Sequence, residues 1–183
     1  MELKQHESSG LWKHGLLITI LFGFTIMIVG GFWIYRNRAP LPQRVVDPNG
    51  QTLFTAGDIQ KGQELFRKRG LMNYGSVLGH GAYLGPDYTA GALHEMTAGM
   101  RAVKAPGGYD ALGAGAQAAI DAEIAAELKE NRYDEATGVL QFTRAQTAGW
   151  QAIVDNWAAT FAHGDPDRAL PKGALLPAAE GGG

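Results

Sequence analysis

Five candidate proton-transferring side chains lie close together in the middle third of the chain. They are His80, Tyr83, Asp87, His94 and Glu95, and side chains of these types act in general acid–base catalysis. Their spacing completes no catalytic motif. A zinc protease carries His-Glu-x-x-His, whereas Ala98 stands here in place of the second histidine. We therefore expect no catalytic residues in this segment, and we expect His80, between two glycines, to be an ordinary polar loop residue.

Glycines at positions 79, 81 and 85 surround His80 and Tyr83. Glycine lets the backbone turn its carbonyl groups outward, and calcium accepts carbonyl oxygens as ligands when carboxylates come from elsewhere. The alternative is a tight structural turn that the Tyr83 side chain fills. Pro86 and Asp87 fit both interpretations. The residues alone do not decide between the two interpretations, a cation-binding loop and a structural turn.

The segment before this loop has the frame of a c-type cytochrome, yet the chain contains no cysteine. A Gly-x-x-x-Phe pattern from Gly62 to Phe66 precedes Leu71-Met-Asn-Tyr-Gly75. In c-type cytochromes such a helix precedes the haem-attachment motif Cys-x-x-Cys-His. Without thiols no haem can be attached through thioether bonds, and Gly75 offers no axial ligand in place of the histidine. We expect a cytochrome c-like domain without covalently bound haem.

Length and charge restrict the class of protein. With 183 residues the chain has room for one domain of ordinary size and an anchor, and such a domain can fold without disulfides. The formal net charge is −2 and the sequence has no basic run. A nucleic-acid partner is therefore not expected.

The uncharged stretch at residues 15–35 is long enough to cross the roughly 30 Å hydrocarbon core of a bilayer as a helix. Trp12, Trp33 and Tyr35 lie at its ends, where aromatic side chains prefer the membrane interface. The alternative is a cleaved signal peptide. Its apolar core would be shorter, and Arg-Asn-Arg-Ala-Pro-Leu-Pro follows here instead of a small-x-small cleavage site. We expect a retained single-pass anchor, whose orientation the flanking charges leave open.

One mainly helical domain with a small β-hairpin is expected after the anchor. Residues 36–43 form a proline-rich linker, because proline stiffens an extended backbone. The two valines at 45–46 should pair with Leu53 and Phe54 across the turn-forming sequence Asp-Pro-Asn-Gly.

The first helix of this domain is predicted to begin at Thr55-x-x-Asp58, a capping pattern, and to end near Arg69 before Gly70. Gly62 in its middle should permit close crossing by a second helix.

Three further helices are predicted from capping residues and apolar stripes. Asp87 or Thr89 caps the first, and Thr143 with Gln146 forms a capping box for the last, which ends at Gly164. Their apolar positions are Leu93, Met96, Met100 and Val103; then Ile120, Ile124 and Leu128; and finally Trp150, Ile153, Val154, Trp157 and Phe161.

The segments between these helices are predicted from composition. Residues 105–115 are a Gly/Ala-rich linker, and residues 133–142 form a turn or short hairpin around Thr137-Gly138. On the middle helix, an acidic set is expected to lie on a solvated face. Its members are Asp121, Glu123, Glu127 and Glu130.

Five sequence motifs after the anchor carry a family signal. They are Arg44-Val-Val-Asp-Pro-Asn-Gly50, Asp58-Ile-Gln-Lys-Gly-Gln63, Gly70-Leu-Met-Asn-Tyr-Gly-Ser76, Gly79-His-Gly-Ala-Tyr-Leu-Gly-Pro-Asp-Tyr-Thr-Ala90 and Asn131-Arg-Tyr-Asp-Glu-Ala-Thr-Gly138. In these motifs the chain closely resembles the N-terminal region of quinol-dependent nitric oxide reductase. The resemblance implies a bacterial inner-membrane protein with a cytoplasmic N-terminus, one transmembrane helix and a periplasmic cytochrome c-like domain that has lost its haem.

The resemblance also implies where haem was lost and where calcium would bind. In the related cytochrome-bearing small subunit, Cys-x-x-Cys-His precedes a similar Gly-x-Gly-Ala-Tyr loop. Registered on that loop, its cysteines fall at Leu71 and Tyr74 and its histidine at Gly75. The carbonyls that match Gly81 and Tyr83 help to hold a calcium ion beside the haems of the catalytic subunit. The implied metal site is therefore these two backbone carbonyls, with Ca²⁺ shared with a partner.

The implied partner is the haem-bearing catalytic membrane subunit of nitric oxide reductase. In the family, a dozen or so further helices carry the histidines that bind two b-type haems and a non-haem iron. This chain has five histidines, two of them before the anchor, and cannot build that site. We therefore expect a fragment or a separate subunit that is not catalytic by itself.

These expectations define an architecture and a function. Residues 1–14 are the cytoplasmic N-terminus, 15–35 the transmembrane helix, 36–43 the linker, 44–172 the periplasmic domain and 173–183 a flexible tail. The expected function is a structural docking domain of a respiratory nitric oxide reductase, which reduces NO to N₂O in denitrification. The alternatives are a free-standing anchored ligand-binding or sensory domain that uses the emptied haem pocket, and an independent enzyme that uses His80 and Asp87.

Overall fold

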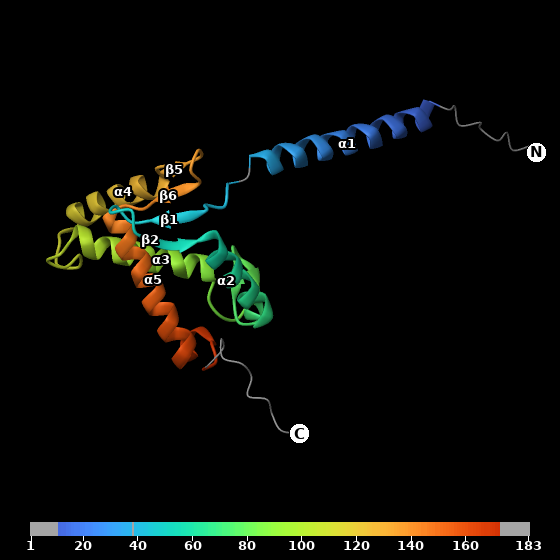
Figure 1. Cartoon of the computed structure of the whole chain (residues 1–183). Helices are drawn as coiled ribbons and strands as arrows, with labels where there is room; N and C mark the ends of the chain where they lie inside the picture. Colours follow the sequence, from blue (N-terminus) through green and yellow to red (C-terminus); the bar gives the residue numbers. More distant parts are fainter. Residues whose placement is uncertain (1–10, 38, 173–183) are drawn as a thin grey trace, which may run out of the picture. The chain divides into compact units, whose positions relative to one another are not determined.

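The computed structural model describes residues 11–37 and 39–172 (Figure 1). The expectations for the first ten residues of the cytoplasmic segment and for the tail at 173–183 lie outside the described residues. The chain divides into two compact units, Met1–Pro40 and Leu41–Gly183.

The described part of the first unit is an apolar helix, α1 (Leu11–Arg36). The hydroxyl groups of Thr19 and Thr25 donate to the carbonyls of Gly15 and Leu21 at 3.0 and 2.8 Å, so these polar side chains are satisfied within the helix. Its length and composition are sufficient to cross a membrane, a property that a signal sequence near an N-terminus shares. α1 is therefore a candidate membrane span, as the sequence predicted.

A small sheet forms one side of the second unit. β1 (Arg44–Val46) pairs with β2 (Thr52–Thr55) as the predicted antiparallel hairpin, and β5 (Tyr133–Asp134) with β6 (Val139–Gln141) as the second hairpin. β1 and β6 pair in parallel, so the strand order is β2-β1-β6-β5. Val45 is completely buried, and the Phe54 ring lies 4.4 Å from the Trp150 ring, centroid to centroid. The sheet therefore packs onto the last helix.

Helix α2 (Ala56–Lys68) has the predicted ends. The Thr55 hydroxyl accepts from the Asp58 backbone N–H, and the Asp58 carboxylate accepts from the Thr55 backbone N–H at 3.0 Å. Gly70 follows with φ 60°, a left-handed conformation that suits glycine. The role predicted for Gly62 is wrong, because a Cβ atom there would meet nothing within 4 Å among the described residues. No helix of the described segments crosses closely at that position.

The helical core lies where α3 (Tyr88–Lys104), α4 (Ala114–Lys129) and α5 (Arg144–His163) meet (Figure 1). Met100, Ile124 and Ala145 are buried at its centre. Four partly buried side chains complete it, namely Met96, Val103, Ile120 and Leu128. The stripes predicted for α3 and α4 thus form the core, except that Leu93 is 55 % exposed.

α3 and α5 cross through two glycines, which is the close approach that the sequence placed at Gly62. A Cβ on Gly99 would lie 2.7 Å from the Cα atom of Gly149, and a Cβ on Gly149 would lie 2.6 Å from the Met96 sulfur. The two backbones therefore touch directly. Of the predicted apolar face of α5, Val154 is exposed instead.

Candidate functional site

The segment that corresponds to a haem-attachment motif forms a short 3₁₀ turn, η1 (Leu71–Asn73), followed by Tyr74 and Gly75. Leu71 is buried, and its carbonyl accepts a hydrogen bond of 3.0 Å from the Tyr88 hydroxyl. A Cβ on Gly75 would lie 2.8 Å from the Tyr88 ring and would collide with the Pro86 carbonyl. The position registered to the proximal histidine therefore has no room for any side chain.

Aromatic rings occupy the space beside this turn. The Tyr88 ring centroid lies 5.5 Å from those of Phe66 and Trp157, and the Trp157 and Phe161 rings stack at 5.4 Å. Tyr88 thus holds α2, α3 and α5 together. An open apolar pocket of about 300 Å³ remains against these rings and Leu71.

A hairpin loop, residues 76–87, follows the turn. β3 (Ser76–Val77) pairs with β4 (His80–Gly81) across the two-residue turn Leu78-Gly79. Both turn residues have positive φ, 52° for Leu78 and 76° for Gly79. Two-residue hairpins require such angles and favour Asn-Gly, so the leucine is the unusual residue.

Asp87 ties the two ends of the hairpin loop together. Its carboxylate accepts from the Gly79 N–H at 2.7 Å, the Ser76 hydroxyl at 2.8 Å and the Ala90 N–H at 2.9 Å. The last of these caps α3, as the sequence predicted. The hydrogen bonds from Ala90, Gly79 and Ser76 favour the ionised carboxylate and lower the pKa of Asp87 to about 2.

Backbone contacts fix the rest of the hairpin loop. The Ala82 N–H donates to the carbonyls of both Met72 and Gly75, at 3.1 and 3.0 Å. Gly81 and Gly85 have no room for a Cβ, because the backbones of Ser76 and Tyr74 lie directly against them. Gly81 and Gly85 are therefore needed for close approach between backbone segments, whereas a Cβ on Gly79 would meet nothing within 4 Å among the described residues.

The large apolar side chains of the hairpin loop point into solvent. Tyr83 is fully exposed, and Leu78 and Leu84 are 73 % and 76 % exposed. The expectation that Tyr83 fills a tight turn is wrong, because backbone contacts fill it instead. Sequence reasoning also missed Ser76, Leu78 and Leu84. The one signal for Leu78 was a leucine followed by glycine in a short turn.

The proton-transferring side chains named from the sequence do not converge. His80 and His94 are exposed, the first on β4 and the second on α3. The Asp87 carboxylate accepts hydrogen bonds from the Ser76 hydroxyl and from the Gly79 and Ala90 N–H groups, and it bonds neither histidine. Within residues 11–37 and 39–172, no group of three His, Cys, Asp or Glu side chains could hold a metal ion. This arrangement gives no support to an independent enzyme.

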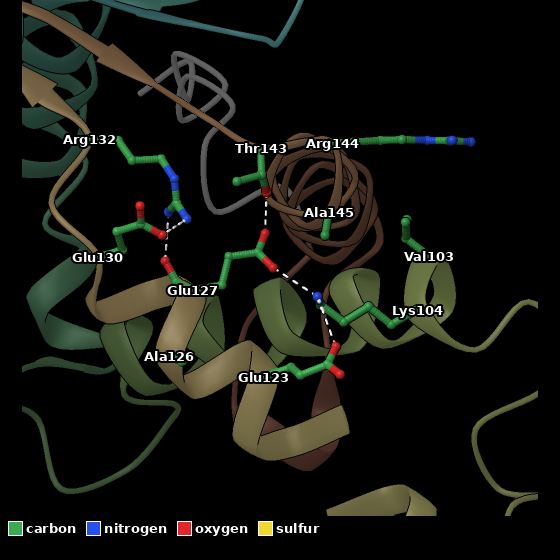
Figure 2. Close-up of a pocket in the computed structure, with 10 residues that line it drawn as sticks. All are labelled: Val103, Lys104, Glu123, Ala126, Glu127, Glu130, Arg132, Thr143, Arg144 and Ala145. Carbon is green, nitrogen blue, oxygen red and sulfur yellow. Dashed lines mark hydrogen bonds and ion pairs between the residues drawn. The ribbon is translucent and has the colours of Figure 1, made fainter. Parts of the chain in front are cut away.

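A polar cluster lies at the C-terminal ends of α3 and α4, next to the helical core and away from the hairpin loop (Figure 2). Glu127 projects from α4 between Lys104 and Thr143 (Figure 2), accepting from the Lys104 ammonium at 2.9 Å and from the Thr143 hydroxyl. Arg132 bonds the Glu130 carboxylate and the Glu127 carbonyl. Arg144, by contrast, points away from the cluster (Figure 2).

The expectation of a solvated acidic face on α4 holds for Glu123 and Glu130, whose side chains are 66 % and 63 % exposed, and is wrong for Glu127. The Glu127 side chain is only 13 % exposed, and Asp121 accepts from Arg101 and Tyr109, both at 2.8 Å. Burial raises the pKa of Glu127, but the hydrogen bonds from Thr143 and Lys104 outweigh it and lower the pKa overall. The acidic residues of α4 therefore join α4 to α3 and to the start of α5.

Comparison with known protein families identifies the family of the second unit. Residues 42–180 match the family model of the cytochrome c-like domain of NorB, a nitric oxide reductase subunit. No curated protein matches the chain. The match spans most of the chain and confirms the resemblance found in the sequence motifs. This chain belongs to the family of NorB cytochrome c-like domains of nitric oxide reductase.

Proposed function

We propose that this chain is the membrane-anchored, haem-less structural domain of a respiratory nitric oxide reductase, which docks onto the haem-bearing catalytic part of the enzyme. One observation carries the proposal. The position registered to the axial histidine is closed around Gly75, while the neighbouring hairpin loop is rigidly held and exposed. The domain has thus lost the means of holding c-type haem but keeps a structured surface beside the former site.

The proposed location is the bacterial inner membrane, with α1 as a single span and the domain in the periplasm. Membership of a membrane-associated enzyme family and the apolar composition of α1 support this location. Residues 37–43 separate α1 from β1, and a chain of that length spans at most about 25 Å when fully extended. Such a tether keeps the domain close to a membrane-embedded partner.

We also propose that the backbone carbonyls of Gly81 and Tyr83 contribute to a calcium site shared with the partner. Both residues are exposed on the hairpin loop. Calcium takes roughly six to eight oxygen ligands, so two carbonyls are an incomplete set. The described part of the chain offers no cluster of three carboxylates or histidines to complete it. The remaining ligands would therefore come from the catalytic part, which would also hold the b-type haems and the non-haem iron.

Copurification tests the proposal. The full chain is coexpressed with the membrane-embedded part of a NorB protein that lacks its own cytochrome c-like domain. We expect the two to copurify, with haem absorbance in the product and with retention reduced by a calcium chelator. A chain that remains a stable monomer in the presence of that partner contradicts docking. Retention that does not respond to the chelator contradicts the calcium site alone.

The apolar pocket of about 300 Å³ beside Trp157 supports one alternative, a free-standing ligand-binding or sensory domain. In that case a small apolar ligand should change Trp157 fluorescence in the isolated chain, and the Tyr88→Trp substitution, which enlarges a ring that lines the pocket, should abolish the change. The docking function predicts no such saturable response.

A further inference from the structure

Leu78 combines two unfavourable properties in the free domain. Its backbone has φ 52°, in the left-handed region that residues other than glycine, asparagine and aspartate rarely adopt. Its side chain is also 73 % exposed, so it gains little from burial. Backbone strain of this kind persists where the surrounding structure enforces it, and it concentrates at functional positions.

Hydrogen bonds hold the backbone around Leu78 in place. The Asp87 carboxylate accepts from the N–H of the next residue, Gly79, at 2.7 Å, and the Thr89 hydroxyl accepts from the Leu78 N–H at 3.3 Å. The Leu78 side chain therefore extends into solvent from a turn whose backbone is hydrogen-bonded. Because the backbone that carries Leu78 is already fixed, association does not have to order that backbone, which is a property of an interface anchor.

Leu78 is one of three exposed apolar side chains on the same loop, with Tyr83 and Leu84. No Asp, Glu, Lys or Arg occurs from Gly70 to Pro86, and the carboxylate of Asp87, the last residue of the loop, is bonded to Ser76, Gly79 and Ala90. The exposed apolar side chains therefore fit a partner surface that is also uncharged and apolar, since burying an unpaired charge against them would be costly. Segments that bind lipid surfaces usually carry Lys or Arg for the headgroups, and this loop has none. These features favour a protein partner over the bilayer.

We propose that Leu78, flanked by Tyr83 and Leu84, is the anchor by which this domain docks into an uncharged apolar recess on the membrane-embedded part of NorB. This inference rests on the proposed function and names the contact through which docking occurs. Because the backbone at Leu78 is strained, this proposal predicts two effects of opposite sign. Replacing the leucine should raise the stability of the free domain and lower its affinity for the membrane-embedded part.

The Leu78→Asn variant tests this signature, because asparagine adopts the left-handed conformation more readily and suits a two-residue hairpin turn. In the full chain we expect the midpoint of thermal unfolding to rise by about 2–4 °C. In the coexpression assay we expect affinity for the membrane-embedded part to fall about tenfold or more, the size typical of a lost anchor residue. Val154→Asn removes an exposed apolar side chain from α5 and should leave binding within twofold.

The outcomes separate the two proposals. If the unmodified chain does not bind, the docking function fails, and the anchor with it. If the unmodified chain binds and Leu78→Asn binds equally well, docking stands and the anchor is overturned. A benzoylphenylalanine probe at position 78 identifies the occupant by photocrosslinking. A product with the membrane-embedded part supports the proposal, whereas a product with lipid or with a second copy of this chain overturns it.

Discussion

The C-terminal end of α3 and the hairpin loop before its N-terminal end are stabilised in different ways. At its C-terminal end the side chains turn inward, so that Met100 is fully buried and Lys104 pairs with a nearly buried Glu127. At its N-terminal end Asp87 anchors a loop whose apolar side chains turn outward, with Tyr83 fully exposed. The C-terminal end of α3 is stabilised through side chains. The hairpin loop before α3 is stabilised mainly through its backbone and leaves Leu78, Tyr83 and Leu84 exposed.

This difference bears on how the proposed haem-less domain is stabilised. The helical core around Met100 and the rings beside Tyr88 supply apolar contacts. The exposed side chains of the hairpin loop add little to the stability of the free domain.

The largest expected effect contrasts one buried and one exposed side chain. Met100→Ala should lower the free energy of unfolding by about 3 kcal/mol, because it leaves a cavity in the helical core. Leu84→Ala should change that free energy by less than about 0.5 kcal/mol, since the side chain is exposed. Denaturant unfolding of the full chain in detergent, followed by tryptophan fluorescence, measures both. Similar costs for the two variants would contradict the contrast.

The next effect compares two helical glycines and should have opposite signs. Gly99→Ala forces a methyl group to within 2.7 Å of the Gly149 backbone, and overpacking of this kind should cost about 1–3 kcal/mol. Gly62→Ala adds a methyl group to open space on α2 and should stabilise the chain by about 0.5–1 kcal/mol through helix propensity. The same unfolding assay reports both. Destabilisation by Gly62→Ala would mean that this glycine does meet a partner.

A smaller effect is expected from the buried polar cluster. Glu127→Gln weakens the bonds to Lys104 and Thr143 and should cost about 1 kcal/mol, the usual worth of a partly buried hydrogen bond. Glu123→Gln is the matched control, because its carboxylate is 66 % exposed and lies 3.4 Å from the same Lys104. Surface pairs of that kind contribute close to nothing. Equal losses for the two variants would indicate that burial does not distinguish them.

The features that could be predicted from the sequence are those set by short-range bonds. The capping pairs Thr55 with Asp58 and Thr143 with Gln146 formed as predicted, because each pair spans one helical turn. Asp87 caps α3, as one of the two caps that the sequence allowed, and residues 133–142 form a hairpin, as one of the two structures expected there. The hairpin of β1 with β2 was predicted outright. Local chemistry decides such features before the chain has a tertiary fold.

The features that could not be predicted depend on segments far apart in the chain. The contact of Gly99 with Gly149 and the parallel pairing of β1 with β6 both join such segments, and no local pattern marks either. Periodicity also could not show that Glu127 would be buried against Lys104. In the candidate site, glycine spacing indicated a constrained loop, but the exposure of Leu78 depends on how Asp87 folds that loop back.

The smallest effect concerns pH and should be confined to the hairpin loop. The pKa of Asp87 is about 2 in the folded chain, below the value of about 3.9 for an unperturbed aspartate. Because folding lowers this pKa, the ionised carboxylate stabilises the loop above about pH 4, and the contribution is lost as the pH falls from about 4 to about 2. The protection of the Gly79 and Ala90 amides against hydrogen exchange, taken relative to the intrinsic exchange rate at each pH, should therefore fall over that interval in the unmodified chain. In Asp87→Asn this protection should already be lower at neutral pH and should change less on acidification, whereas Asp155→Asn, which removes an acidic charge from α5, should behave like the unmodified chain.

If acid loosens the helical core around Met100 before it loosens the loop, the two ends of α3 are coupled, and the separation between a stabilising end and a contact end is incorrect.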